Sequence, residues 1–186
     1  TAGLAALTLY LPFDFVKSYN GRERGFTRKM QTKAINMRES DSTNFSVALP
    51  TIGIFGYELI GHRIIDMVGL TDSTIAKHSE KPIEGMQTTW KEVKHNSEYL
   101  LSANLDYIIF STDLKPSAPA ERALLLYPQF INNYRTIGWF YQTDTTSSDG
   151  TLIVAFKRMR ENKGPYIPTY PVQWVEYYKQ GLDAYS

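Results

Sequence analysis

Three aspartates at the ends of apolar runs are the side chains of this sequence best placed to do chemistry. Asp66 and Asp72 flank the end of one apolar run, and Asp113 follows another. If these runs form parallel strands, their carboxyl ends meet at the edge of the sheet where such proteins bind ligands. Carboxylates at that edge would accept hydrogen bonds from sugar hydroxyls or coordinate a hard cation. We therefore expect Asp66, Asp72 and Asp113, together with Tyr57, to lie nearest any ligand.

The segment from Asp66 to Asp72 also has a structural interpretation, and the sequence leaves both open. Asp72 precedes a short helical stretch as a favourable N-cap residue, and Asp66 could accept hydrogen bonds from the amide groups of the turn. Gly69 is expected to supply a backbone angle or a close approach that other residues cannot reach. The expected structural turn residues are Gly53, Gly56, Gly69 and Leu70.

The sequence lacks the residue patterns of several other common classes of functional site. Cysteine is absent, and His62 and His78 do not have His-x-x-x-His spacing, so we expect no metal site. Gly53-x-x-Gly56 lacks the G-x-G-x-x-G pattern of dinucleotide-binding loops, and no Gly-x-Ser-x-Gly elbow of a serine hydrolase is present. His95 lies in a charged stretch and is expected to be exposed. We assign no catalytic residue and no cofactor.

Composition and charge narrow the class of protein. The chain has 186 residues, 42% of them hydrophobic, which fits one domain with a packed core. Its formal net charge of +1 argues against a nucleic-acid-binding domain, which is usually clearly basic. The segment 17–38 is nevertheless strongly cationic. It either attracts anionic lipid beside a membrane, worth about 1 kcal/mol per cation, or forms the solvated face of a helix. Its cations are Lys17, Arg22, Arg24, Arg28, Lys29, Lys33 and Arg38.

The order of the expected elements predicts an α/β fold. The apolar periodicity and the turn residues predict strands that alternate with helices, followed by two β-rich runs near the end of the chain. We expect a mainly parallel central sheet flanked by helices, with a C-terminal antiparallel hairpin. The expected helices cover residues 22–39, 52–60, 72–78, 90–103 and 120–134, the last with an interruption near Pro128. The expected strands cover residues 45–49, 63–68, 105–110, 136–142 and 151–158.

Residues 1–186 are predicted to form a single soluble domain with two unusual ends. Residues 3–13 are apolar but shorter than a membrane-spanning helix requires. We interpret residues 1–16 either as the stub of a membrane segment or as a buried first strand or helix. Residues 164–186 form a proline-rich and aromatic tail that contains Trp174 and Tyr178.

Residues 45–78 and 96–111 resemble the extracytoplasmic C-terminal region of bacterial multi-span membrane glycosyltransferases. These enzymes are related to protein O-mannosyltransferases and lipid A aminoarabinose transferases. The resemblance rests on a strand and small-residue turn before an aromatic-rich helix, on the pattern Asp-x-x-Gly-Leu-x-Asp at 66–72, and on a later Asp-Tyr-Ile strand at 106–108. Leu105 stands where proline is usual in that family.

The resemblance implies an accessory role. The family's catalytic carboxylates lie in early loops between membrane spans, and this chain has no such spans. It therefore implies an extracytoplasmic (periplasmic) domain of a cell-membrane glycosyltransferase that uses a lipid-linked sugar donor. The implied partners are the membrane-embedded remainder of the same polypeptide and a lipid-linked sugar or acceptor, with no nucleic acid. The isolated chain is expected to be inactive.

Two other classes of function stay open. A non-catalytic cell-envelope interaction module would expose an apolar or aromatic surface that includes Trp174 and Tyr178. A stand-alone small α/β enzyme would bring two carboxylates, or a histidine and a carboxylate, together in one cleft.

Overall fold

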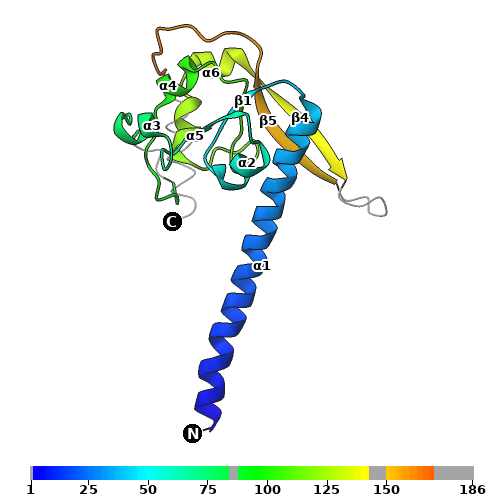
Figure 1. The fold of residues 1–186 in the computed structure, drawn as a ribbon. Helices are drawn as coiled ribbons and strands as arrows, with labels where there is room; N and C mark the ends of the chain where they lie inside the picture. Colours follow the sequence, from blue (N-terminus) through cyan, green and yellow to red (C-terminus); the bar gives the residue numbers. More distant parts are fainter. Residues whose placement is uncertain (1, 84–87, 143–149, 170–186) are drawn as a thin grey trace. The chain divides into compact units, whose positions relative to one another are not determined.

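The computed structural model describes residues 2–83, 88–142 and 150–169. The chain falls into two compact units, one formed by residues 1–40 and 53–60 and the other by residues 41–52 and 61–186. Figure 1 shows the elements in chain order. The single domain expected over the whole chain stays a prediction.

The first unit contains the long helix α1 (Ala2–Ser40) and most of α2 (Ile52–Glu58). α2 lies where the sequence predicts a helix. α1 contains the predicted helix 22–39 but begins much earlier, at Ala2, so it also takes in the apolar segment 3–13. Glu58 links them, because it accepts a hydrogen bond from Gln31 at 2.7 Å and its backbone carbonyl accepts one from Arg38 at 2.9 Å. No helix among the described residues has both the length and the apolar character needed to cross a membrane.

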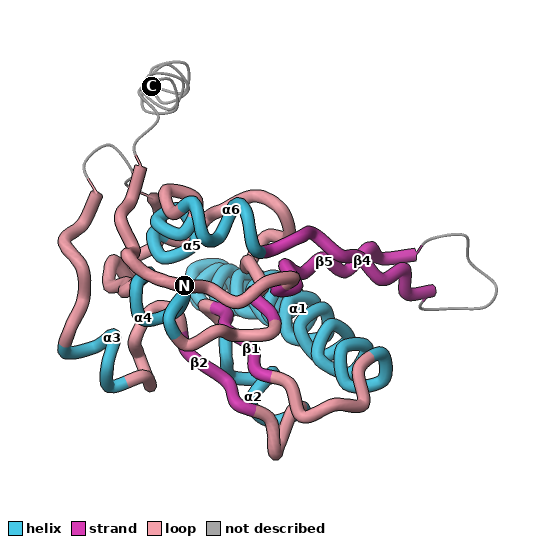
Figure 2. The backbone as a smooth tube through the Cα atoms, turned by 90° about the horizontal axis from the view of Figure 1, so that it is seen from above, coloured by secondary structure: helices cyan, strands magenta, loops and turns pink. Residues whose placement is uncertain are grey.

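The second unit is built on a mixed five-stranded sheet with the order β2-β1-β3-β5-β4. β1 runs parallel to β2 and β3, whereas β5 runs antiparallel to β3 and β4. The α/β class is therefore confirmed, and so is the C-terminal hairpin, whose strands β4 and β5 lie side by side in magenta in Figure 2. The strands are β1 (Ser46–Leu49), β2 (Arg63–Asp66), β3 (Tyr107–Ile108), β4 (Tyr134–Gln142) and β5 (Gly150–Arg158).

The parallel character of the sheet is more limited than the sequence predicts. It holds for the three strands β2, β1 and β3, and the hairpin then extends the sheet in the antiparallel direction. Parallel sheets commonly carry an antiparallel edge of this kind. The reversal is seen at β3, where Tyr107 and Ile108 pair with Lys157 and Phe156 of β5 in the antiparallel direction.

Four short helices complete the second unit: α3 (Ser73–Lys77), α4 (Ser97–Ser102), α5 (Pro119–Leu124) and α6 (Pro128–Asn133). Pro119 and Pro128 occupy the start of α5 and α6, where the missing proline N–H costs no helical hydrogen bond. The expected helix 120–134 is thus divided at Pro128, as the proline predicts.

The helix expected over 90–103 is wrong in its first half. Asn96 caps α4, because its side chain accepts a hydrogen bond from the N–H of Tyr99 at 2.8 Å. The preceding residues bond elsewhere, since the carbonyl of His95 accepts the N–H of Glu80 at 2.8 Å. The apolar periodicity extends from residue 90 to residue 103, but the helix itself begins only after its N-cap, Asn96.

The core of the second unit joins the sheet to the short helices. Ala48, Ile65 and Ile108 from the strands are buried with Leu100 and Leu124 from the helices. An aromatic cluster adds Phe110, Phe130 and Phe156, with ring centroids 4.7 to 5.9 Å apart. This core fixes the ends of the strands, and both candidate sites lie at those ends.

Candidate functional site

Asp66 is a buried structural carboxylate in the turn after β2. It is 2% exposed. Its Oδ1 accepts the N–H of Val68 at 3.0 Å, and its Oδ2 accepts the N–H of Thr71 at 2.7 Å. The hydroxyl of Thr71 also donates to Oδ2, at 3.3 Å. The side chain is therefore occupied by its own turn, as the structural interpretation predicts.

Asp72 is the N-cap of α3. Its Oδ1 accepts the N–H groups of Thr74 and Ile75 at 2.9 and 3.0 Å. Its Oδ2 accepts the hydroxyl of Tyr99 at 3.2 Å, which ties this helix start to α4. The predicted N-cap is confirmed, and the carboxylate satisfies donors at the helix start that would otherwise lack a partner.

Gly69 is required by the turn between the two aspartates. Its φ angle is +72°, and a Cβ atom there would lie 2.9 Å from Cγ2 of Ile75. Both predictions for Gly69, a special backbone angle and a close approach, are confirmed. Gly53 and Gly56 differ, because a Cβ atom at either would meet no described atom within 4 Å. Leu70 lies in the turn with 73% of its surface exposed.

The remaining predicted ligand residues are placed apart from this turn. Tyr57 belongs to the first unit and is 73% exposed. Asp113 has a φ angle of +63° and forms a local bridge with Phe110, so the chain after β3 turns tightly. Asp66 and Asp72 are the two predicted residues that the structure brings into one turn. Ligand binding by the four residues stays a prediction.

Glu121 is the buried carboxylate that sequence reasoning missed at this end of the fold. It is fully buried in the first turn of α5. Its Oε1 accepts the N–H of Ser111 at 2.5 Å, and its Oε2 accepts the N–H groups of Ser117 and Ala118 at 2.6 and 2.9 Å. The sequence contains a pattern that could have indicated this role, because a proline followed two residues later by a glutamate, as at Pro119 and Glu121, is typical of a helix start.

An open pocket lies at the opposite, amino ends of the parallel strands. We call it the amino-edge pocket. Its volume is about 530 Å³. The residues that define its chemistry come from four separate segments of the second unit and were not predicted as a site. They are Asn44, Ser46, His62, Arg63, Asn104, Asp106 and Arg158.

Strand register explains why these distant residues meet. Ser46 pairs with Arg63 across β1 and β2. The next pairings, Val47 with Tyr107 and Tyr107 with Lys157, place Asp106 beside Ser46 and Arg158 beside Asp106. Arg63, Ser46, Asp106 and Arg158 therefore form one row across four neighbouring strand positions. Neighbouring strands are spaced about 4.8 Å apart, so the row is about 14 Å long.

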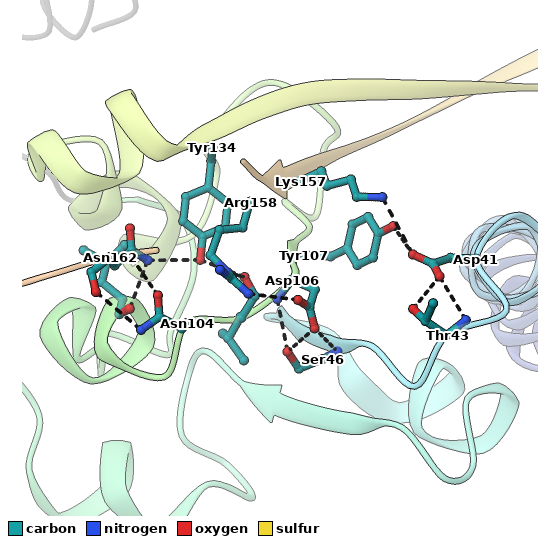
Figure 3. A network of polar contacts seen from close by, with 12 residues as sticks. Asp41, Thr43, Ser46, Asn104, Asp106, Tyr107, Tyr134, Lys157, Arg158 and Asn162 are labelled. Carbon is teal, nitrogen blue, oxygen red and sulfur yellow. Dashed lines mark hydrogen bonds and ion pairs between the residues drawn. The ribbon is translucent and has the colours of Figure 1, made fainter. Parts of the chain in front are cut away.

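Asp106 organises the centre of this row, as Figure 3 shows. Its Oδ2 accepts both the N–H and the hydroxyl of Ser46, at 2.9 and 2.8 Å. Its Oδ1 accepts Nη2 of Arg158 at 3.1 Å, and Nε of Arg158 donates to the carbonyl of Leu105 at 3.2 Å. The carboxylate is thus neutralised and held in place by its neighbours.

Other polar side chains of the pocket make fewer hydrogen bonds than Asp106. Arg63 and Asn44 are exposed, and neither side chain has a hydrogen-bond or ion-pair partner within the described ranges. The ring of His62 lies 4.1 Å from that of Phe45, and its Nδ1 is buried without a hydrogen bond in the part of the chain that the structure describes. These groups leave hydrogen-bond donors available to a ligand.

Asn104 and Asn162 make one wall of the pocket rigid. The N–H of Asn162 donates to the side chain of Asn104 at 2.7 Å, and the side chain of Asn162 donates to the carbonyl of Leu101 at 3.0 Å. The hydroxyl of Tyr134 donates to the carbonyl of Leu105 at 2.9 Å. Burial raises the pKa of Tyr134 to about 12, so this phenol stays protonated at neutral pH.

A second polar group of residues in Figure 3 lies beside this row. Asp41 accepts hydrogen bonds from the hydroxyls of Thr43 and Tyr107, both at 2.5 Å, and lies 3.8 Å from Nζ of Lys157. These bonds, first that from Thr43 and then that from Tyr107, lower the pKa of Asp41 to about 2. Burial, followed by donation to Asp41, raises the pKa of Tyr107.

His95 is buried, so the expectation that it is exposed is wrong. It is 1% exposed, and its Nε2 lies 3.6 Å from Oε2 of Glu80. The hydroxyl of Tyr127 donates to the same oxygen at 3.3 Å. This is a histidine–carboxylate pair of the kind that a stand-alone enzyme would need. Neither member lines the amino-edge pocket, however, and Glu80 also accepts the N–H of Glu98 at 3.0 Å.

The comparisons with known proteins identify a family without an assigned activity. The family model described as "Domain of unknown function (DUF8728)" matches residues 22–162, which is most of the chain. The chain belongs to this DUF8728 family. No curated protein and no solved structure matches the chain.

The DUF8728 match contains both groups of residues described above. The turn from Asp66 to Asp72 and the whole amino-edge pocket, from Asn44 to Arg158, lie inside it. The tail from residue 164 lies outside the match, and Trp174 and Tyr178 also lie outside the described residues. Among the described residues, no group of three histidine or acidic side chains is arranged to hold a metal ion.

Proposed function

We propose that this chain is an extracytoplasmic accessory part of an integral-membrane glycosyltransferase that uses a lipid-linked sugar donor. In this role it holds or shapes the donor or acceptor and carries none of the catalytic carboxylates. The chain lies on the periplasmic side of the cell membrane. Its partner is the membrane-embedded remainder of the same polypeptide.

The observation that carries this proposal is the structural role of the two carboxylates in the Asp66–Asp72 motif. This motif gives the sequence its likeness to such enzymes, and both carboxylates hold backbone N–H groups of the turn and of α3. A carboxylate saturated in this way is poorly suited to donate or remove a proton during transfer. The motif supports a role in the architecture of an accessory domain.

Helix α1 supports the membrane-side part of the proposal. It carries the cationic segment, of which Lys33 is buried, on the same helix as exposed aromatic side chains. Phe15 and Tyr19 stack with ring centroids 6.2 Å apart, and Phe26 follows one heptad after Tyr19. Aromatic and cationic side chains on one helix are favourable beside an anionic lipid surface.

The native reading frame and a transfer assay test the proposal together. We expect the reading frame to encode several membrane spans in addition to this chain. In membranes containing the complete enzyme, we expect removal of the segment 41–169 to abolish transfer from a lipid-linked donor while the membrane part is still inserted. A reading frame without further spans, or full transfer without this segment, would refute the proposal.

A further inference from the structure

We propose that the amino-edge pocket binds a phosphate group, carried as a phosphomonoester or phosphodiester. The proposal concerns a different site from the Asp66–Asp72 turn. It rests on the unused hydrogen-bond donors, the charge, the arrangement of the groups along the row and the size of the pocket.

The first argument is the excess of donors. Arg63 is exposed at the start of β2, and its guanidinium has no partner in residues 2–83, 88–142 or 150–169. Arg158 uses Nε and Nη2 for the fold, and within those same residues its Nη1 makes no hydrogen bond. Asn44 adds an exposed side-chain amide on the pocket wall. Guanidinium groups recognise phosphate oxygens through paired N–H donors.

The second argument is the charge. The ionised groups of the lining are the two arginines and Asp106, which gives a net charge of +1 before His62 is considered. Asp106 does not repel an anion as a free carboxylate would, because the guanidinium of Arg158 compensates its charge and Ser46 donates two hydrogen bonds to it. The charge that remains uncompensated is that of Arg63.

The third argument is the arrangement of these groups along the row. Arg63 and Arg158 stand at its two ends, about 14 Å apart at the backbone, with Ser46 and Asp106 between them. Arg158 is turned toward the centre by its 3.1 Å bond to Asp106. A phosphate above the centre of the row lies within reach of both long side chains.

The fourth argument is the size of the pocket. A volume of about 530 Å³ is within the range of pockets that hold small organic ligands and is more than a bare phosphate needs. The pocket therefore has room for a substituent such as a sugar ring. Identification of the phosphate as that of a lipid-linked sugar rests on the proposed function, whereas phosphate binding itself does not.

Amide chemical shifts of the ¹⁵N-labelled chain test the inference directly at low salt. The probes are glucose 1-phosphate, uncharged methyl glucoside, and vesicles of phosphatidylglycerol with phosphatidylcholine vesicles as reference. We expect glucose 1-phosphate to bind with a Kd of about 1 mM and to shift the amides of Asn44, Arg63 and Asn104. We expect Arg63→Ala to weaken this binding about tenfold and Arg160→Ala to change it less than twofold. Arg160 is exposed and outside the pocket, so it controls for loss of charge.

Each outcome decides the matter. Binding of glucose 1-phosphate that depends on Arg63 supports the inference with a soluble ligand. Arg63-dependent binding of phosphatidylglycerol vesicles supports it with a lipid headgroup. Equal losses in Arg63→Ala and Arg160→Ala, equal binding of methyl glucoside, or no saturable shift with any probe would overturn it. None of these readouts requires glycosyl transfer, so failure here is distinguishable from failure of the proposed function.

Discussion

The two aspartates of the 66–72 turn allow the same substitution to be compared in two hydrogen-bonding arrangements. At Asp66 the two backbone donors go to different oxygens, with Val68 on Oδ1 and Thr71 on Oδ2. At Asp72 both helix N–H groups go to the same oxygen, Oδ1. Asparagine retains one carboxamide oxygen, so it can reproduce the second arrangement and cannot reproduce the first.

The magnitudes follow from this difference. Asp66→Asn loses at least one hydrogen bond to a charged acceptor, worth about 1.5–3 kcal/mol, and turns an NH₂ group toward an N–H in a buried turn. We expect it to lower the free energy of unfolding by about 2–4 kcal/mol. Asp72→Asn retains both N-cap bonds, and asparagine is as good an N-cap as aspartate. We expect it to cost less than about 1 kcal/mol, through the lost charge at the helix start and because the hydroxyl of Tyr99 must accept from the new NH₂ group where it donated to Oδ2.

Urea denaturation of the two variants, followed by far-UV circular dichroism at neutral pH, measures both values. With an m-value of about 2 kcal/mol/M, Asp66→Asn should lower the midpoint by about 1–2 M and Asp72→Asn by less than about 0.5 M. Equal midpoints, or a larger effect at Asp72, would contradict the structural role assigned to Asp66. A full loss of transfer activity in Asp72→Asn, with stability unchanged, would instead indicate a ligand contact at Asp72.

Three further predictions test other parts of the structure. Gly69→Ala should destabilise the chain by about 2–3 kcal/mol in the same assay, because of its positive φ angle and the 2.9 Å contact, whereas Gly53→Ala in α2 should be neutral or stabilising by up to about 1 kcal/mol. Glu121→Gln should cost about 2–4 kcal/mol, because one oxygen cannot accept three N–H groups that use two oxygens, and unchanged thermal stability would contradict this. The lowered pKa of Asp41 contributes stability that is fully present above pH 3.8 and is lost as the pH falls through about 2. Asp41→Asn should remove about 1 kcal/mol of that acid dependence, since the group lies near solvent, and identical acid titrations of the two proteins would refute it.

The sequence predicted local elements well because their signals are local. The apolar runs of β1 and β2, the N-cap Asp72 and the helix-starting Pro128 each act on a few neighbouring residues. The helix expected over 90–103 failed for a tertiary reason. The carbonyl of His95 accepts the N–H of Glu80, and Asn96 caps α4, which begins at Ser97 and not at residue 90 as the periodicity indicates.

The amino-edge pocket could not be predicted in the same way. Ser46, Asp106 and Arg158 become neighbours through the pairing of β1 with β3 and of β3 with β5, and the sequence does not specify those pairings. The expectation of a mainly parallel sheet also directed attention to the carboxyl ends of the strands. There the structure uses Asp66, Asp72 and Glu121 to hold backbone N–H groups.

The uneven pairing of β5 determines which part of the sheet unfolds locally first. Among the described strands, β5 pairs with β3 at Phe156 and Lys157, so its stretch 150–155 is held by β4 alone. A two-stranded ribbon is marginally stable without further support. Its amides should therefore exchange with deuterium through local fraying, well before those of β1, which has a partner on each side. Substitutions in this ribbon can then alter exchange rates while the global melting temperature stays constant.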